Sequence, residues 1–272
     1  MSSESPVIVD RHPLGTEGEA VAAILRLNRP EELNPIDADT LATLDGLLDE
    51  IEADEAVRAV LITGRGRGFS AGGDLKKYQE LQRDAVAFPR FIQDLHRVFG
   101  RLRGGPVPAI ALVNGVTAAG GLELLLNCDF ALAARSARIG DGHLNFGQMG
   151  GGGVLTLLPR AVGRARAAEL IYTGRFLDAD EAASWGLVNR VVDDDRLEAE
   201  GCALAEGMAT KSRLALANAK YVLHSVWADN ASVEGGLRLE RERDAYYCLT
   251  SEDAPEGLRA FADKRTPHFR GR

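Results

Sequence analysis

The sequence predicts an α/β protein, because segments typical of strands and of helices alternate over its first 196 residues. The predicted strands are short and continuously apolar, as in Ala109–Val113, which is typical of strands buried on both faces of a parallel sheet. From about Leu197 the pattern is helical almost to the end of the chain. We therefore expect a core over residues 1–196 and a helical region over residues 197–272.

The first part of the chain predicts two strands, a helix and a third strand. Turn-forming residues at 13–18 favour a hairpin between the first two strands, and an aspartate suited to capping precedes the helix. The predicted elements are strands at Val7–Val9, Ala20–Leu27 and Val57–Thr63, and a helix that starts after Asp37 or Asp39 and ends near Ala53.

A loop of small residues follows the third strand. Phe69–Leu75 reads Phe-Ser-Ala-Gly-Gly-Asp-Leu, and its glycines allow the backbone to approach a ligand closely. The preceding stretch, Gly64–Gly68, is not a dinucleotide fingerprint, because the third glycine would have to stand at position 69. About 28 residues of predicted helix then precede Pro106.

The candidate chemistry is concentrated in residues 108–127, where a buried strand is followed by a helix that we expect to start at about Ala118. Gly120 and Gly121 leave the first N–H groups of this helix uncovered, at the end that carries positive partial charge. Glu123 follows Gly120 by three residues and therefore lies on the same helix face. The pattern fits a functional site in which a carboxylate lies beside backbone N–H groups that bind an anion. It equally fits a structural role, in which the glycines allow close packing and the glutamate complements the helix dipole.

The rest of the core predicts a loop at Ile139–Gly147 and then a run of four glycines, Gly150–Gly153. The run is not a phosphate-binding loop, because Val154-Leu155 stands where Lys-Ser or Lys-Thr would be needed. The other predicted elements are strands at Phe130–Ala134 and Val188–Val192, helices at Val154–Val162, Arg164–Tyr172 and Asp178–Trp185, and breaks in the helical tail near Thr210, Asp229–Ser232 and Thr250–Asp253.

Composition narrows the class of function. The 272 residues carry a formal net charge of −8, which argues against broad binding to nucleic acid or to an anionic membrane. We find no apolar stretch long enough for a membrane span and no signal-peptide pattern. Cys128, Cys202 and Cys248 show neither metal-ligand spacing nor a disulfide framework. We expect a cytoplasmic protein without a metal site.

Together these motifs resemble the enoyl-CoA hydratase/isomerase, or crotonase, family over nearly the whole chain. The motifs that carry the resemblance are Leu27–Pro30, Phe69–Leu75, Asn114-Gly115, Ala119–Leu124, Cys128-Asp129, Gly174-Arg175, Gly186–Asn189, Ser251–Ala254, Phe261 and Lys264-Arg265. The resemblance implies a β-β-α superhelix of the crotonase fold and a C-terminal helical trimerisation region. The expected assembly is a homotrimer or a dimer of trimers.

The resemblance also implies an acyl-CoA thioester as substrate and no cofactor, since coenzyme A is part of the substrate. The thioester enolate would bind in an oxyanion hole formed by the N–H groups of Ala71 and Gly120, which we expect to point into one pocket. Glu123 matches the first of two glutamates that family hydratases carry. The residues implied to bind the substrate are Ala71, Gly72, Gly73, Asp74, Leu75 and Gly121.

The second glutamate of the family pattern is replaced in this chain. Where the family has Gly-x-Pro-Glu, residues 140–143 read Gly-Asp-Gly-His, so that His143 occupies the place of the glutamate. Imidazole titrates near neutrality and is the usual general acid or base. Asp141 either orients the ring, as in catalytic triads, or serves only the turn before Gly142. Gly150–Gly153 replaces a Pro-Gly-x-Gly pattern, and we expect it to widen the acyl pocket.

Three functions remain open at this point. The leading one is an enoyl-CoA hydratase or isomerase that uses Glu123 and His143. The second is a hydrolase that cleaves a carbon–carbon bond in a β-keto or cyclic β-diketone acyl-CoA. The third is a catalytically weak acyl-CoA-binding protein kept for assembly, against which the presence of Glu123 and of both oxyanion positions argues. The sequence does not specify the acyl group.

Overall fold

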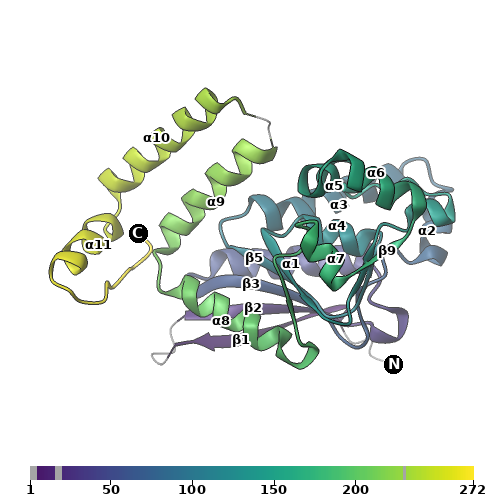
Figure 1. Cartoon of the computed structure of the whole chain (residues 1–272), viewed down its shortest axis with the longest axis horizontal. Coiled ribbons are helices and arrows are strands. Elements are labelled where there is room, and N and C mark those ends of the chain that lie inside the picture. The colour runs from purple at the N-terminus through teal and green to yellow at the C-terminus, as the bar shows by residue number, and fades with distance from the viewer. Residues whose placement is uncertain (1–4, 16–19, 229–230) are drawn as a thin grey trace.

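The computed structural model describes residues 5–15, 20–228 and 231–272. Residues 16–18 of the predicted hairpin turn and residues 229–230 of a predicted helix break lie outside these ranges. The described chain forms an α/β core from which three C-terminal helices extend (Figure 1). Within these ranges, no helix is both long and apolar enough to cross a membrane.

The larger sheet has six strands in the order β1-β2-β3-β5-β7-β10. β1 and β2 are antiparallel, as the predicted hairpin requires, and the other neighbours are parallel. The strands are β1 Val7–Leu14, β2 Ala20–Leu27, β3 Val57–Gly64, β5 Ala109–Val113, β7 Phe130–Ala134 and β10 Arg190–Val192. The predicted buried strands are confirmed, although β1 is longer and β10 shorter than the sequence indicated.

A smaller sheet of four short strands, in the order β4-β6-β8-β9, was not predicted. Its strands are β4 Gly68–Ser70, β6 Val116–Ala118, β8 Arg138–Gly140 and β9 Phe176–Asp178. Three residues are too few to show the alternation of a strand, so the pattern indicated loops or the start of a helix here. Because β4, β6 and β8 each follow a strand of the larger sheet, the chain repeats a β-β-α unit. The expected β-β-α superhelix is confirmed.

The described helices correct the predicted boundaries in two places. The long helix expected before Pro106 is two helices, because Asp84 accepts the N–H groups of Val86 and Ala87 and so caps a new start. The central helix begins at Gly120 rather than Ala118. The helices of the core are α1 Ala38–Ala53, α2 Leu75–Leu81, α3 Ala87–Gly104, α4 Gly120–Leu126, α5 Val154–Val162, α6 Arg164–Thr173, α7 Ala179–Ser184 and α8 Leu197–Ala209.

The larger sheet is buried on both faces, which explains its continuously apolar strands. Along β2, Ala23 and Leu25 belong to one apolar core, whereas Ala22 and Ile24 face a second core. Residues of α8 complete this second core, so that α8 packs with the sheet although the helical region was expected to begin at residue 197.

The helices that extend from the core are α9 Arg213–Ala228, α10 Val233–Thr250 and α11 Asp253–Ala262 (Figure 1). Lys220 anchors α9, because its buried ammonium group donates to the carbonyls of Leu102 and Val107 and to Oδ2 of Asp129, at 2.6, 2.8 and 2.7 Å. Beyond this anchor the helices expose large apolar side chains. These include Leu223, Trp227, Val233, Leu237, Tyr246, Leu249, Leu258 and Phe261.

Candidate functional site

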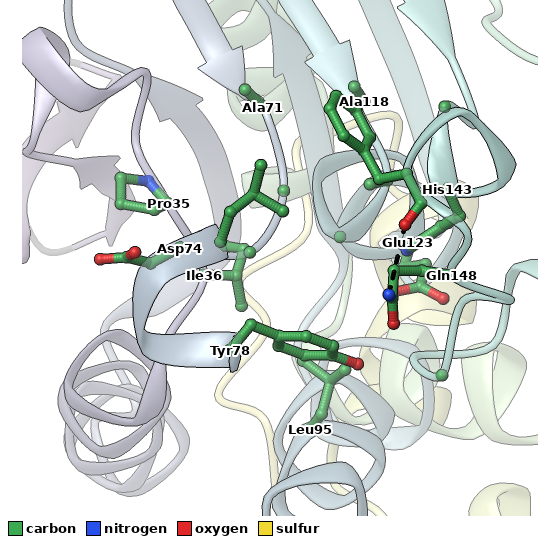
Figure 2. A pocket seen from close by; sticks show the side chains of 18 of the residues that line it. Pro35, Ile36, Ala71, Asp74, Tyr78, Leu95, Ala118, Glu123, His143 and Gln148 are labelled. Atoms are coloured by element: carbon green, nitrogen blue, oxygen red, sulfur yellow. Dashed lines mark hydrogen bonds between the residues drawn. The ribbon is translucent and has the colours of Figure 1, made fainter. Parts of the chain in front are cut away.

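The candidate site is a pocket of about 650 Å³ beside the smaller sheet (Figure 2). β4, β6 and β8 are parallel, so their carboxyl ends lie at one edge, where ligands of α/β proteins usually bind. This topology brings together three loops that are far apart in the sequence. The predicted site residues that line the pocket are Ala71, Gly72, Gly73, Asp74, Leu75, Gly120, Glu123 and His143.

Glu123 lies in the first turn of α4 and is 2% exposed. Its Oε1 accepts the backbone N–H groups of Gly152, at 2.7 Å, and of Val154, at 3.3 Å. Burial raises the pKa of this carboxyl, although the charge of His143 and the two N–H groups oppose the shift. The environment of Glu123 therefore makes its carboxyl group a weaker acid than a carboxyl group in water.

His143 begins the turn that follows β8, and its side chain is 13% exposed. Gly142 has a φ of 69°, which lets the chain turn so that residues 141 and 143 meet. Nδ1 of His143 lies 2.7 Å from Oδ1 of the fully buried Asp141. A carboxylate only accepts, so Nδ1 carries the hydrogen and Nε2 is the nitrogen left for the pocket.

The pKa of His143 is raised by this environment. Burial alone would lower it, but the hydrogen bond to Asp141 and the negative charges of Glu123 and Asp141 outweigh the burial. The backbone carbonyl of Asp141 also accepts the N–H of Ala119 at 2.7 Å. The histidine loop is thus attached directly to the start of α4.

The glycine run Gly150–Gly153 packs against neighbouring side chains, and its expected widening of the pocket stays a prediction. A Cβ on Gly152 would lie 2.4 Å from Oε2 of Glu123, and a Cβ on Gly150 would lie 3.1 Å from the ring of His143. A Cβ on Gly151 would lie 2.8 Å from Ile92. Neighbouring side chains fill the space that the missing Cβ atoms leave. The run lets the backbone approach both candidate catalytic side chains, Glu123 and His143.

Ala71 is not the free donor that the sequence predicted. Its N–H donates to the carbonyl of Leu33 at 2.9 Å, so the predicted role of this N–H in an oxyanion hole is wrong. Two residues further on, the N–H of Gly73 makes no hydrogen bond to any residue that the structure describes, and the same holds for the N–H of Gly120. Both glycines line the pocket.

The loop that carries Gly73 touches the start of α4. A Cβ on Gly72 would lie 2.7 Å from Cβ of Ala119 and 3.0 Å from the nitrogen of Gly120. Ala119 itself has a φ of 49° and a ψ of −118°, a conformation that costs an alanine about 1–3 kcal/mol. Backbone strain of this kind is typical of functional sites. Gly73 and Gly120 are therefore the candidate pair of donors.

Two other residues that were predicted to bind substrate, Gly121 and Asp74, make contacts that stabilise the fold. Gly121 does not line the pocket, because its Cα packs against β4, and a Cβ there would lie 2.2 Å from the carbonyl oxygen of Ser70. Asp74 does line the pocket, but its carboxylate caps α2 by accepting the N–H groups of Lys76 and Lys77, at 3.0 and 3.2 Å.

The apolar wall of the pocket was not predicted from the sequence. Tyr78 follows the Asp74 cap by four residues, so helical spacing from that cap was an available signal. The other residues of the wall belong to no motif and become neighbours only in the fold. They include Ile36, Phe91, Ile92, Leu95, Phe146 and Phe176.

The fold and the site define an α/β protein with a carboxyl group and an imidazole beside backbone N–H groups that have no partner in the described residues. The model of the enoyl-CoA hydratase/isomerase family matches residues 16–272. The chain therefore belongs to this family, as its motifs indicated, and has the crotonase fold. A putative enoyl-CoA hydratase of Thermus thermophilus is 38% identical over 248 residues, which are 91% of this chain and 96% of that protein.

Other similar proteins agree with this assignment. The 1,2-epoxyphenylacetyl-CoA isomerase of Escherichia coli is 37% identical over 255 residues, covering 91% of this chain and 94% of the isomerase. The crystal structure of an enoyl-CoA hydratase from Bacillus anthracis has a TM-score of 0.88 at 32% identity, covering 98% of this chain and 100% of that one. Similar family members thus carry names for more than one reaction.

Proposed function

We propose that this protein processes acyl-CoA thioesters by stabilising a thioester enolate and by moving protons with Glu123 and His143. One observation carries the proposal: the two side chains line the same pocket as the unpaired N–H groups of Gly73 and Gly120. Carboxyl and imidazole groups exchange protons, and N–H groups stabilise an oxygen that becomes negative.

Gly73 and Gly120 are proposed to donate to the thioester oxygen. When a proton leaves or joins the carbon next to the thioester carbonyl, negative charge develops on that oxygen. Donors that are already aimed at this oxygen are typically worth roughly 3–4 kcal/mol each in the transition state. The strained start of α4 at Ala119 supports this role, because it leaves the first helical N–H without a partner.

Hydration of an enoyl-CoA is the reaction that we propose first. Glu123, as a carboxylate, takes a proton from water, and the hydroxide adds to the β-carbon. The enolate that forms is bound by Gly73 and Gly120, and the imidazolium of His143 returns a proton to the α-carbon. The raised pKa of His143 supports this assignment, because it favours the protonated ring near neutral pH. Asp141 keeps Nε2 directed at the substrate by holding Nδ1.

The Asp141–His143 hydrogen bond also favours a second candidate, the hydrolysis of a β-keto or cyclic β-diketone acyl-CoA. Here Nε2 of His143 takes a proton from water, which attacks the ketone carbon. The bond between that carbon and the α-carbon breaks, and its electron pair remains on the thioester as the bound enolate. The imidazolium of His143 then protonates the enolate at the α-carbon, which restores the neutral ring. A carboxylate that holds the opposite nitrogen is the usual companion of such a histidine base.

A panel of CoA thioesters tests the proposal. Purified protein would be given crotonyl-CoA, a β,γ-enoyl-CoA and a β-keto or cyclic β-diketone acyl-CoA, with reactions without protein as the reference. We expect conversion of an enoyl-CoA into a 3-hydroxyacyl-CoA or its double-bond isomer. If only the β-keto or β-diketone thioester is cleaved, hydration is contradicted and the carbon–carbon bond hydrolysis is supported. Binding without turnover of any thioester would contradict both reactions.

A further inference from the structure

Tyr78 brings a hydroxyl group into the pocket that the proposed acid–base chemistry does not use. The residue lies on α2, and its side chain lines the pocket. Its ring meets Phe88 and Phe91 edge-on, with centroid distances of 5.3 and 6.2 Å. Aromatic pairs favour this arrangement, so the two contacts fix the direction in which the hydroxyl points.

The hydroxyl of Tyr78 points across the pocket towards the side on which Glu123, His143 and Gln148 lie (Figure 2). It makes no hydrogen bond to any residue of the described ranges. Burial, and then the negative charge of Glu123, raise the pKa of this hydroxyl. The group is therefore protonated at neutral pH and presents a hydrogen to whatever occupies the pocket.

On its own side of the pocket, the Tyr78 hydroxyl lies beside apolar side chains, which offer no acceptor. Phe91 touches the ring, and Leu95 lies beside it (Figure 2). An acyl group that enters the pocket displaces water from this wall, and a hydroxyl group left without a partner weakens binding. An acyl group with an oxygen of its own would remove that penalty.

We infer that Tyr78 selects acyl-CoA thioesters that carry an oxygen near the β-carbon, to which it donates its hydroxyl hydrogen. The position follows from the chemistry, because in the proposed hydration Glu123 delivers water to the β-carbon, and Tyr78 faces Glu123. This inference rests on the proposed function, since it takes the pocket to hold the acyl part of a thioester. The favoured class is 3-oxoacyl-CoA or 3-hydroxyacyl-CoA.

Tyr78→Phe tests the inference, because it removes the hydroxyl and keeps the ring with its two edge contacts. Calorimetric titration would give the affinities of acetoacetyl-CoA, which has a β-oxygen, and of butyryl-CoA, which has none. Mass spectrometry would verify that acetoacetyl-CoA stays intact during the titration. We expect the ratio of the two affinities to fall about tenfold in Tyr78→Phe, the size of one lost hydrogen bond.

Tyr172→Phe is the matched control, because it removes a hydroxyl that is exposed on α6, outside the pocket lining. It should keep the wild-type ratio of affinities. If Tyr78→Phe binds both thioesters with the wild-type ratio, the selection by Tyr78 is refuted while the proposed function stands. If the wild-type protein binds neither thioester, the proposed function fails, and the inference fails with it.

Discussion

Nδ1 of His143 lies 2.7 Å from a carboxylate oxygen of Asp141, only two residues earlier in the chain. The aspartate is fully buried, and Oδ2 has no partner in the described part of the chain. The carboxylate of Asp141 therefore hydrogen-bonds to the imidazole of His143 alone, among the described residues. Nε2 is the ring nitrogen that remains for the pocket.

Replacing His143 by Ala should lower kcat about 10²–10⁴-fold, because the variant loses the group that exchanges a proton with the substrate. The fold should be retained, since the ring lies at the pocket and not in either apolar core. Steady-state kinetics and circular dichroism check the two parts. His12→Ala, on β1 and outside the pocket lining, should keep wild-type turnover. Full activity in His143→Ala would leave Glu123 to act alone.

Replacing Asp141 by Asn should move a limb of the pH–rate profile to lower pH. The carboxylate raises the pKa of His143, so a neutral amide lets that pKa fall. If the imidazolium is the acid, activity is lost as pH rises and the alkaline limb moves. If the neutral ring is the base, the acidic limb moves instead. The profile therefore also distinguishes the two reactions.

A double variant shows whether Asp141 acts through His143. Asp141→Asn combined with His143→Ala should be no slower than His143→Ala alone, because groups that act as a unit are not additive. An additive loss would assign Asp141 a role that does not depend on His143. Asp178→Asn is the control, since this residue caps α7 outside the pocket lining and Asn caps as well.

Replacing Gly152 by Ala should impair catalysis through Glu123. The new Cβ would lie 2.4 Å from Oε2 of Glu123 and 2.8 Å from Leu95, so the carboxyl group must move. We expect a loss of about 10²-fold in kcat and about 1–3 kcal/mol of destabilisation. Gly46→Ala, which meets nothing within 4 Å, should keep kcat and stabilise α1 by about 0.5–1 kcal/mol. An unchanged kcat in Gly152→Ala would show that Glu123 takes no part in the reaction.

Asp37 should make the stability of the fold depend on pH. Asp37 caps α1 and lies 2.8 Å from both Arg29 and Lys77. Burial would raise the pKa of its carboxyl, but the hydrogen bonds from Arg29 and Lys77 hold it far below the usual range. The contribution is fully present above the unfolded value of about 3.9 and is lost as pH falls below it.

Asp37→Asn keeps a capping side chain and removes the charge, so it should lower the free energy of unfolding at pH 7 by about 1–3 kcal/mol. The difference in the free energy of unfolding between Asp37→Asn and wild type should shrink as the pH falls towards about 2, where nearly all carboxyl groups of the unfolded chain are protonated. Urea unfolding at a series of pH values measures it. A difference that does not change with pH would show that the charge of Asp37 contributes nothing.

The apolar side chains exposed on α9–α11 should be covered by other copies of the chain. Large apolar patches on a protein surface usually mark interfaces, and homo-oligomers usually have closed symmetry. We propose a trimer or a pair of trimers, as the family resemblance implies. Sedimentation at micromolar concentration should give the mass of three or six chains. A stable monomer would contradict this assembly.

Much of the fold could be predicted from the sequence, because its signals are local. Continuous apolar runs identified β3, β5 and β7, whereas the resemblance to the family identified Glu123 and His143 as the candidate acid–base pair. The smaller sheet could not be predicted, since strands of three residues show no period. Ala71 was assigned by motif matching alone. Which N–H in that loop is free depends on its pairing with Leu33, a contact that only the fold creates.

The glycine run shows the same limit. A run of glycines suggests empty space when only the sequence is known. Whether that space is empty depends on which side chains pack against the glycines. In the structure Glu123, His143 and Ile92 occupy the space around these glycines. The wall that contains Tyr78 also comes together only after folding, because Tyr78 of α2 meets Phe88 and Phe91 of α3 there.

The arrangement of the site along the β-β-α repeats has a consequence for how such enzymes diversify. Each repeat delivers one part at the edge of the smaller sheet: Gly73 after β4, Gly120 and Glu123 after β6, and His143 after β8. A substitution at position 143 can therefore exchange one of the two proposed proton-transfer groups and leave the proposed donors, Gly73 and Gly120, in place.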